Sequence, residues 1–157
     1  MRIRKLIPDD RDELLRILKA TGVFKDYEIE IADEVLRESL NPASSYRTYC
    51  CVDDHQFVIG YVCFGATPCT MGTYDLYWMA VDPARQGSGV GRDLLRFAEE
   101  RVKQEAARLM IIETSSTPEY DAARKLYQGM GYRQIAILPD FYRPGDSKVI
   151  YGKNFVS

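Results

Sequence analysis

The sequence predicts a mixed α/β fold in which helices cover both faces of a central mixed sheet. Short apolar segments with strand character alternate with amphipathic helical segments through the second half of the chain. Two helical segments follow the first strand, and a turn-like Asp53-Asp54-His55 separates two further strand segments, which indicates a hairpin. The 157 residues fit one domain, residues 1–157, with no linker or repeat.

Local signals place the elements of the first half. Pro8 ends the first strand, Gly22 ends the helix that follows, and Asn41-Pro42 stops the next helix. An aromatic and apolar stretch that ends at Val81 is typical of a central strand. In order, we expect a strand at 3–7, a helix ending at Gly22, a helix at 28–40, and strands at 46–52, 57–66 and 74–81.

In the second half, apolar residues keep helical spacing over a long stretch that begins at Gly89. Pro118 opens a further helix, which glycines 129 and 131 end. We therefore expect a helix at 89–108, a strand at 109–114, a helix from Pro118 to the turn at 129–131, and strands at 132–138 and 148–151.

Composition and charge argue against several classes of function. The formal net charge is −2 with Lys and Arg spread along the chain, so nucleic acid is not an expected partner. No apolar run approaches the roughly 20 residues of a membrane span, and no signal peptide is apparent, so we expect a cytoplasmic protein that does not bind membranes. The spacing of Cys50, Cys51, Cys63 and Cys69 and the single histidine, His55, favour free thiols over a metal site.

The glycine-rich run Gln86-Gly87-Ser88-Gly89-Val90-Gly91 carries the strongest functional signal. It joins the end of a strand to the start of a long helix, and glycines let the backbone approach a ligand closely. The first N–H groups of a helix lack internal partners and favour an anion, so a pyrophosphate suits this position. Arg85 and Arg92 would add positive charge at the rim. A turn without a ligand is the alternative, and neither the Rossmann nor the Walker spacing fits.

Two motifs together resemble those of the GNAT superfamily of N-acetyltransferases. The first is Val81-Asp82-Pro83 followed by Gln86-x-x-Gly89-x-Gly91, which is similar to the superfamily's acetyl-CoA-binding motif. The second is the run from Ala122 to Tyr132, which resembles a later helix and turn of the superfamily. The resemblance implies a mostly antiparallel sheet with one splayed parallel strand pair, here 74–81 and 109–114.

The resemblance also implies acetyl-CoA as co-substrate, with no metal. The pantetheine arm would pair with the backbone of Met79, Ala80 and Val81. The pyrophosphate would be held by the N–H groups of Gln86, Gly87, Ser88, Gly89, Val90, Gly91 and Arg92. Many relatives carry an asparagine seven residues before a tyrosine that corresponds to Tyr127, and that position is Tyr120 here. Ser115, Ser116 or Thr117 would then supply the polar contact to the cofactor.

For catalysis, Tyr127 matches the superfamily tyrosine that protonates the leaving thiolate. The alternative is an aromatic residue that only packs its helix onto the sheet. Asp75 is the first candidate for the general base and Glu113 the second, and a solvated or salt-bridged carboxylate is the alternative for Asp75.

The expected acceptor is a primary amine of a small molecule or of a peptide, attacked directly in a ternary complex. The candidate acceptor-binding residues are Tyr27, in an acidic segment, Tyr77, Phe141 and Tyr142. The alternatives are a solvated helix start for the Tyr27 segment and core packing for Tyr77. Residues 138–146 form either a loop that closes over the cleft or a β-turn between the last two strands, and the loop resembles one in relatives that acetylate protein N-termini. A longer acyl group or a non-catalytic acyl-CoA-binding domain are the alternatives, and relatives suggest a homodimer.

Overall fold

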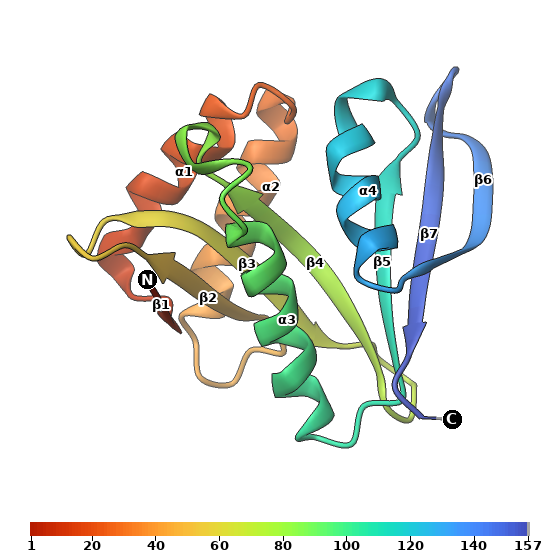
Figure 1. Cartoon of the computed structure of the whole chain (residues 1–157), viewed down its shortest axis with the longest axis horizontal. Helices are drawn as coiled ribbons and strands as arrows, with labels where there is room; N and C mark the ends of the chain where they lie inside the picture. Colours follow the sequence, from red (N-terminus) through yellow and green to blue (C-terminus); the bar gives the residue numbers. More distant parts are fainter. Residues whose placement is uncertain (157) are drawn as a thin grey trace. The chain divides into compact units, whose positions relative to one another are not determined.

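The computed structural model describes residues 1–156. It contains a seven-stranded sheet in the order β1-β2-β3-β4-β5-β7-β6, in which β4 and β5 are parallel, so the predicted mixed α/β fold is confirmed (Figure 1). The strands are β1 (Arg2–Lys5), β2 (Arg47–Val52), β3 (Val58–Ala66), β4 (Thr73–Val81), β5 (Leu109–Ser115), β6 (Arg133–Arg143) and β7 (Asp146–Asn154). The α-helices are α1 (Arg11–Ala20), α2 (Asp26–Ser39), α3 (Val90–Lys103) and α4 (Asp121–Gly129).

The chain divides into two compact units. The first unit comprises residues 1–65 and 78–98, and the second comprises residues 66–77 and 99–157. In the first unit β1, β2 and β3 form an antiparallel sheet. Neighbouring β2 side chains contact helices on opposite faces, since Thr48 hydrogen-bonds Ser39 of α2 and Tyr49 lies 4.7 Å from the ring of Phe97 of α3. Helices therefore cover both faces of this sheet, as Figure 1 shows.

A glycine in β3 determines how closely α3 approaches the sheet. A Cβ atom added at Gly60 would lie 2.9 Å from the Ala80 carbonyl oxygen and 3.3 Å from side-chain atoms of Leu94 and Val90. Real Cβ atoms do not tolerate the first of these distances, so only glycine allows this packing. Since Val90 is the first residue of α3, Gly60 helps to place the start of that helix.

In the second unit β5 pairs with β4 in parallel, from Thr73 opposite Leu109 to Leu76 opposite Ile112. On its other edge β5 pairs antiparallel with β7, and β7 pairs with β6. Helix α4 packs against this part of the sheet through Tyr127, whose ring lies 6.0 Å from that of Tyr151 in β7. Helix α4 and the Tyr151 side chain therefore lie on the same face of the sheet.

The bounds of α3, β6 and β7 differ most from the sequence prediction. Helix α3 ends at Lys103 and not at residue 108, because Ala106 takes a left-handed conformation (φ 62°) and the N–H of Ala107 bonds back to the carbonyl of Val102. The last two strands are longer than predicted, and Arg143 pairs with Asp146 across a tight turn at Gly145. Of the two alternatives for residues 138–146, the backbone therefore supports the turn of a β-hairpin.

Candidate active site

The glycine-rich loop lies in the first unit, where β4 leads into α3. A short 3-10 helix, η2 (Pro83–Arg85), follows β4, residues 86–89 are exposed, and α3 begins at Val90. Gly87 and Gly89 have φ values of 79° and 89°, a conformation that residues with side chains rarely adopt. An added Cβ at either glycine would meet no atom within 4 Å, so the backbone here borders open space.

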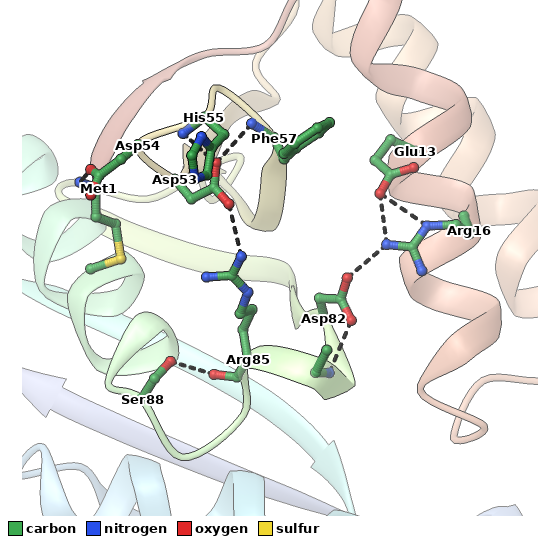
Figure 2. Close-up of polar contacts among 11 residues, drawn as sticks. Met1, Glu13, Arg16, Asp53, Asp54, His55, Phe57, Asp82, Arg85 and Ser88 are labelled. Carbon is green, nitrogen blue, oxygen red and sulfur yellow. Dashed lines mark hydrogen bonds and ion pairs between the residues drawn. The ribbon is translucent and has the colours of Figure 1, made fainter.

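Side chains at the two ends of η2 hold this loop (Figure 2). Asp82 accepts the N–H of Ala84 at 3.0 Å and forms an ion pair with Arg16 at 2.6 Å. Arg85 forms an ion pair with Asp53 at 2.8 Å. Arg85 was predicted to add positive charge at the rim of the loop, and its guanidinium is paired with the carboxylate of Asp53. Arg92 is exposed, in the first turn of α3.

The three residues predicted to pair with the pantetheine arm lie at the end of β4. Ala80 is buried, and Met79 and Val81 are half-buried. The role predicted for these residues belongs to their backbone, so side-chain exposure does not decide it. Their position just before the glycine-rich loop makes one continuous stretch of main chain from Met79 to Arg92.

Tyr127 lies in α4, within the second unit, and is 7% exposed. Its ring contacts those of Tyr132 and Tyr151, so it does pack its helix against the sheet. Burial, with a smaller contribution from Tyr151, raises the pKa of Tyr127 to about 12. The hydroxyl is thus a neutral hydrogen-bond donor at neutral pH.

The two candidate bases lie on the face of the second unit's sheet opposite Tyr127. In the parallel pair, Asp75 is opposite Ile111 and shares its face of the sheet. Glu113 lies on that same face of β5, because side chains alternate along a strand. Ile112, between them, points to the other face, where it is opposite Tyr151. Asp75 accepts a hydrogen bond from Thr67 at 2.7 Å and is half-buried. The Glu113 carboxylate is 2.9 Å from the ammonium of Lys148, and its side chain is 47% exposed.

The end of β5 is a closed polar network. Ser115 is buried, and its hydroxyl bonds Asp146 and Thr117. Arg124 donates to the carbonyl oxygens of Ser115 and Thr117. The Ser115 hydroxyl, predicted to contact the cofactor, is therefore already engaged within the protein. Tyr120, at the position of the superfamily's asparagine, is half-buried in the 3-10 helix η3 (Pro118–Tyr120).

The candidate acceptor-binding residues come from both units. Tyr27, in the first turn of α2, is 62% exposed, and the neighbouring Glu28 accepts the N–H of Lys25 and so helps to cap that helix. In the second unit, Tyr77 is half-buried, and Phe141 and Tyr142 are exposed near the tip of the β6–β7 hairpin. The ammonium of Lys148 lies 3.8 Å from the centre of the Phe141 ring, a cation–π contact.

The sequence analysis did not identify Asp53, Arg16, Thr67 or Lys148, which hold the candidate residues in place. Each lies at least eight positions from its partner, so no local motif marks these pairs. The tertiary arrangement of helices, turns and strands brings them together.

The cysteine thiols are all free, with Cys50, Cys51 and Cys63 buried and Cys69 exposed. Burial raises the pKa of the Cys63 thiol to about 11. Among residues 1–156, no group of three or more histidine, cysteine, aspartate or glutamate side chains is placed to hold a metal ion. Within the same residues, no helix has both the length and the apolar character needed to span a membrane.

Comparison with known proteins gives consistent results. A family profile described as an acetyltransferase (GNAT) domain matches residues 44–134. Blasticidin-S acetyltransferase of Streptomyces morookaense is 30% identical over 139 residues, which cover 88% of this chain and 86% of that protein. The crystal structure of an acetyltransferase assigned to the GNAT family, from Desulfovibrio desulfuricans, superimposes with a TM-score of 0.91 and is 38% identical over 99% of both chains. An aminoglycoside 6'-N-acetyltransferase in complex with coenzyme A has a TM-score of 0.78 at 17% identity, covering 100% of this chain and 98% of that one.

Proposed function

The chain belongs to the GNAT family of acetyl-CoA-dependent N-acyltransferases, and on this premise we propose that it transfers the acetyl group of acetyl-CoA to a primary amine of a small molecule. The observation that carries the proposal is the loop at residues 86–89, which presents exposed backbone at the start of a long helix. The nucleophile is the amine itself, which attacks the thioester directly in a ternary complex.

The loop suits the diphosphate of coenzyme A for three reasons. The N–H groups of the first turn of α3 have no partners within the helix and lie at its positive end. The open space beside Gly87 and Gly89 leaves room for phosphate oxygens close to the backbone. The hydroxyl of Ser88 is turned back onto the Arg85 carbonyl, so it stabilises the loop and leaves anion binding to the N–H groups. The backbone of Met79, Ala80 and Val81 would extend this contact along the pantetheine arm.

The reaction forms one C–N bond and breaks one C–S bond. The neutral amine adds to the thioester carbonyl, the C–S bond breaks, and the nitrogen loses one proton while the thiolate gains one. The residues of this chain must therefore accept a proton on the amine side and donate a hydrogen bond on the thiol side. Tyr127 and the two carboxylates lie on opposite faces of the sheet in the second unit, which suits a division of these two tasks.

We assign the thiol side to Tyr127. Its pKa of about 12 keeps the phenol protonated, so it can donate a hydrogen bond to the departing thiolate throughout the pH range of most assays. Because a thiol is more acidic than such a phenol, the hydrogen bond stabilises the departing thiolate, which then takes its proton from water and not from Tyr127.

We assign the amine side to Asp75 in preference to Glu113. Asp75 is held by a neutral hydroxyl, that of Thr67, so its negative charge is not matched by a cation in this contact. Glu113 already forms an ion pair with Lys148, and protonating it would cost that ion pair. Both carboxylates lie on one sheet face, and the aromatic hairpin tip with Phe141 shares it, because Lys148 contacts both Glu113 and Phe141.

A small-molecule acceptor is the first expectation because the relative named for acetylating blasticidin S aligns over most of both chains. In the second unit, Tyr77, Phe141 and Tyr142 supply half-buried or exposed aromatic surface for an amine with an apolar or cationic group, and Tyr27 does so in the first unit. A peptide amine is the second candidate, on the resemblance of the hairpin to that of enzymes that acetylate protein N-termini.

Calorimetry and a thiol assay together test the proposal. Titration of coenzyme A into the folded protein should release or absorb heat with one site per chain. Mixing with acetyl-CoA and a panel of small amines, aminoglycosides, blasticidin S and short peptides should then release free thiol with at least one acceptor. The exposed Cys69 reacts with thiol reagents and is subtracted as a blank without acceptor. Absence of coenzyme binding would overturn the proposal.

A further inference from the structure

The loop at residues 86–89 has almost no packing of its own. All four residues are exposed, and the space beside Gly87 and Gly89 is open. A loop that must be ordered when its ligand arrives loses affinity through conformational entropy, so loops that bind tightly are usually held beforehand. The interactions that hold this loop lie in the segment just before it, at Asp82 and Arg85 (Figure 2).

The first of these interactions joins Arg85 to the turn between β2 and β3. Asp53 in that turn is only 8% exposed, and one of its carboxylate oxygens accepts the N–H groups of His55 and Phe57 at 2.9 and 3.0 Å. The other oxygen accepts the Arg85 guanidinium at 2.8 Å. The β2–β3 turn therefore holds the Asp53 carboxylate in place, and this carboxylate holds the Arg85 guanidinium.

The second interaction joins Asp82 to helix α1. One carboxylate oxygen of Asp82 accepts the N–H of Ala84, and the other accepts the guanidinium of Arg16 at 2.6 Å. Arg16 is itself held by Glu13, one turn earlier in α1, also at 2.6 Å. The backbone N–H of Asp82 donates to Ile59 in β3 at 2.8 Å. Both ends of the segment 82–85 are therefore attached to elements that do not belong to the loop.

We propose that Asp53 and Arg16 are positioning residues for coenzyme A. Acting through Arg85 and Asp82, they hold the segment that leads into the loop, so that the N–H groups of the loop and of the first turn of α3 point at the diphosphate before it binds. This inference rests on the proposed function, since it concerns the same loop.

The proposal assigns Arg85 a different role from the one its charge suggests. An arginine beside a phosphate-binding loop would ordinarily be taken as a ligand of the phosphates. Here, turning Arg85 toward the ligand would leave the buried carboxylate of Asp53 without its cation, which is costly. Arg85 therefore acts on the ligand through the backbone of the loop.

The test measures coenzyme A affinity by calorimetry and steady-state kinetics for five variants and one control. Asp53→Asn keeps an oxygen for the N–H groups of His55 and Phe57 but removes the charge that holds Arg85. Arg85→Gln removes the other partner, the double variant removes both, and Arg85→Lys keeps a cation at the same place. Arg16→Gln breaks the second interaction. Arg96→Gln, which removes an exposed arginine that pairs with Asp93 within α3, is the matched control.

We expect Asp53→Asn and Arg85→Gln each to weaken coenzyme A binding about 3- to 10-fold, and the double variant to be no weaker than the weaker single variant. The KM for acetyl-CoA should rise by the same factor, with kcat at saturation and the KM for the amine unchanged. Arg85→Lys should recover part of the affinity, Arg16→Gln should behave as Asp53→Asn does, and Arg96→Gln should bind as the wild type does. Melting curves confirm that each variant is folded.

The possible failures point to different errors. If Arg85→Gln weakens binding while Asp53→Asn leaves it unchanged or tightens it, Arg85 is a direct phosphate ligand and the positioning role is wrong. If wild-type protein binds coenzyme A and no variant differs from it, the proposed interactions do not position the loop. If wild-type protein binds no coenzyme A, the proposed function itself fails and takes this inference with it.

Discussion

At the scale of single residues, the environment of each candidate group determines its task. The Tyr127 hydroxyl is on a ring packed between two other tyrosines, and burial raises its pKa to about 12. The carboxylates of Asp75 and Glu113 lie on the other sheet face, one bonded to a hydroxyl and the other to an ammonium. The same contacts that make Tyr127 a packing residue also keep its hydroxyl protonated.

Replacing Tyr127 by phenylalanine removes the hydroxyl and keeps the ring that packs on Tyr132 and Tyr151. We expect kcat to fall about 10- to 100-fold and coenzyme A affinity to stay nearly the same. Release of free thiol measures the first and calorimetry the second. Tyr132→Phe, at another buried tyrosine in contact with the first, is the control and should turn over close to the wild-type rate. Equal rates for the two variants would mean that Tyr127 only packs its helix against the sheet.

Asparagine at position 75 retains a carbonyl oxygen for the Thr67 hydroxyl but cannot take up a proton. Asp75→Asn should therefore lower kcat/KM at least 10-fold, and the loss should shrink as the pH rises and more of the amine is neutral in solution. The matched change, Glu113→Gln, should cost about threefold or less. Comparing the two pH profiles identifies the base, and the reverse order of losses would assign the amine side to Glu113.

The site residues that stand in a local sequence motif could be predicted. The residues that hold them in place through contacts distant in sequence could not. Gly87 and Gly89 stand in a recognisable motif between a strand and a helix, so their backbone role follows from spacing. The engagement of the Ser115 hydroxyl by Asp146 depends on pairing between β5 and β7, which no local pattern shows. In the same way, the sequence does not show that Arg85 is paired, because its partner, Asp53, lies 32 positions away.

At the scale of elements, the junction from β4 through η2 to α3 is the part of the fold on which the function depends most. The elements were predicted in the correct order, because apolar periodicity and glycine or proline boundaries are local signals. The predicted end of α3 was wrong by five residues, because the left-handed conformation at Ala106 stops the helix where the sequence has no glycine. The β6–β7 hairpin was underestimated because Pro139 and Pro144 suggest a loop.

The role of the junction is tested by aspartate at Gly89. This residue has φ 89° and open space beside it, so the change brings backbone strain and a negative charge at the expected diphosphate site. Binding of coenzyme A should fall at least 100-fold in calorimetry.

The matched control for this variant is Gly22→Asp, at the end of α1. Gly22 has φ 69° and likewise no neighbour within 4 Å of an added Cβ, so the strain is similar and the loop is not involved. This control should lose comparable stability in thermal melts and still bind coenzyme A. Similar binding losses in both variants would mean that Gly89→Asp acts through folding and not through the ligand.

At the scale of the whole molecule, ion pairs that lower carboxylate pKa values are concentrated in the first unit. For Asp10, burial alone would raise the pKa, but hydrogen bonds from Arg4 and from the N–H of Ile7 lower it below its usual range. The pKa values of three further aspartates in the same unit are also lowered, and each carboxylate contacts an arginine: Asp33, Asp53 and Asp82.

Acid stability follows from the direction of these shifts. Because the folded pKa lies below the unfolded value of about 3.9, the ionised carboxylates stabilise the fold above that pH, and this contribution is lost as the pH falls through the folded pKa. Thermal melts should show a steep loss of Tm below about pH 4. Asp10→Asn should lower the unfolding free energy at pH 7 by roughly 2–4 kcal/mol and flatten that acid dependence. Asp12→Asn, at a 94% exposed side chain, is the control and should change stability by less than about 0.5 kcal/mol.

The close packing of Ala80 and α3 against Gly60 limits which substitutions this enzyme tolerates in β3. A methyl group at that position would collide with the Ala80 carbonyl and press on Val90, the first residue of α3, so the start of that helix would have to shift. A library that randomises the interior of β3 would then yield clones with poor coenzyme affinity whose altered residue never meets the coenzyme. Anyone mapping such clones by phenotype would draw the binding site too large, and would find its boundary only by measuring melting and affinity side by side.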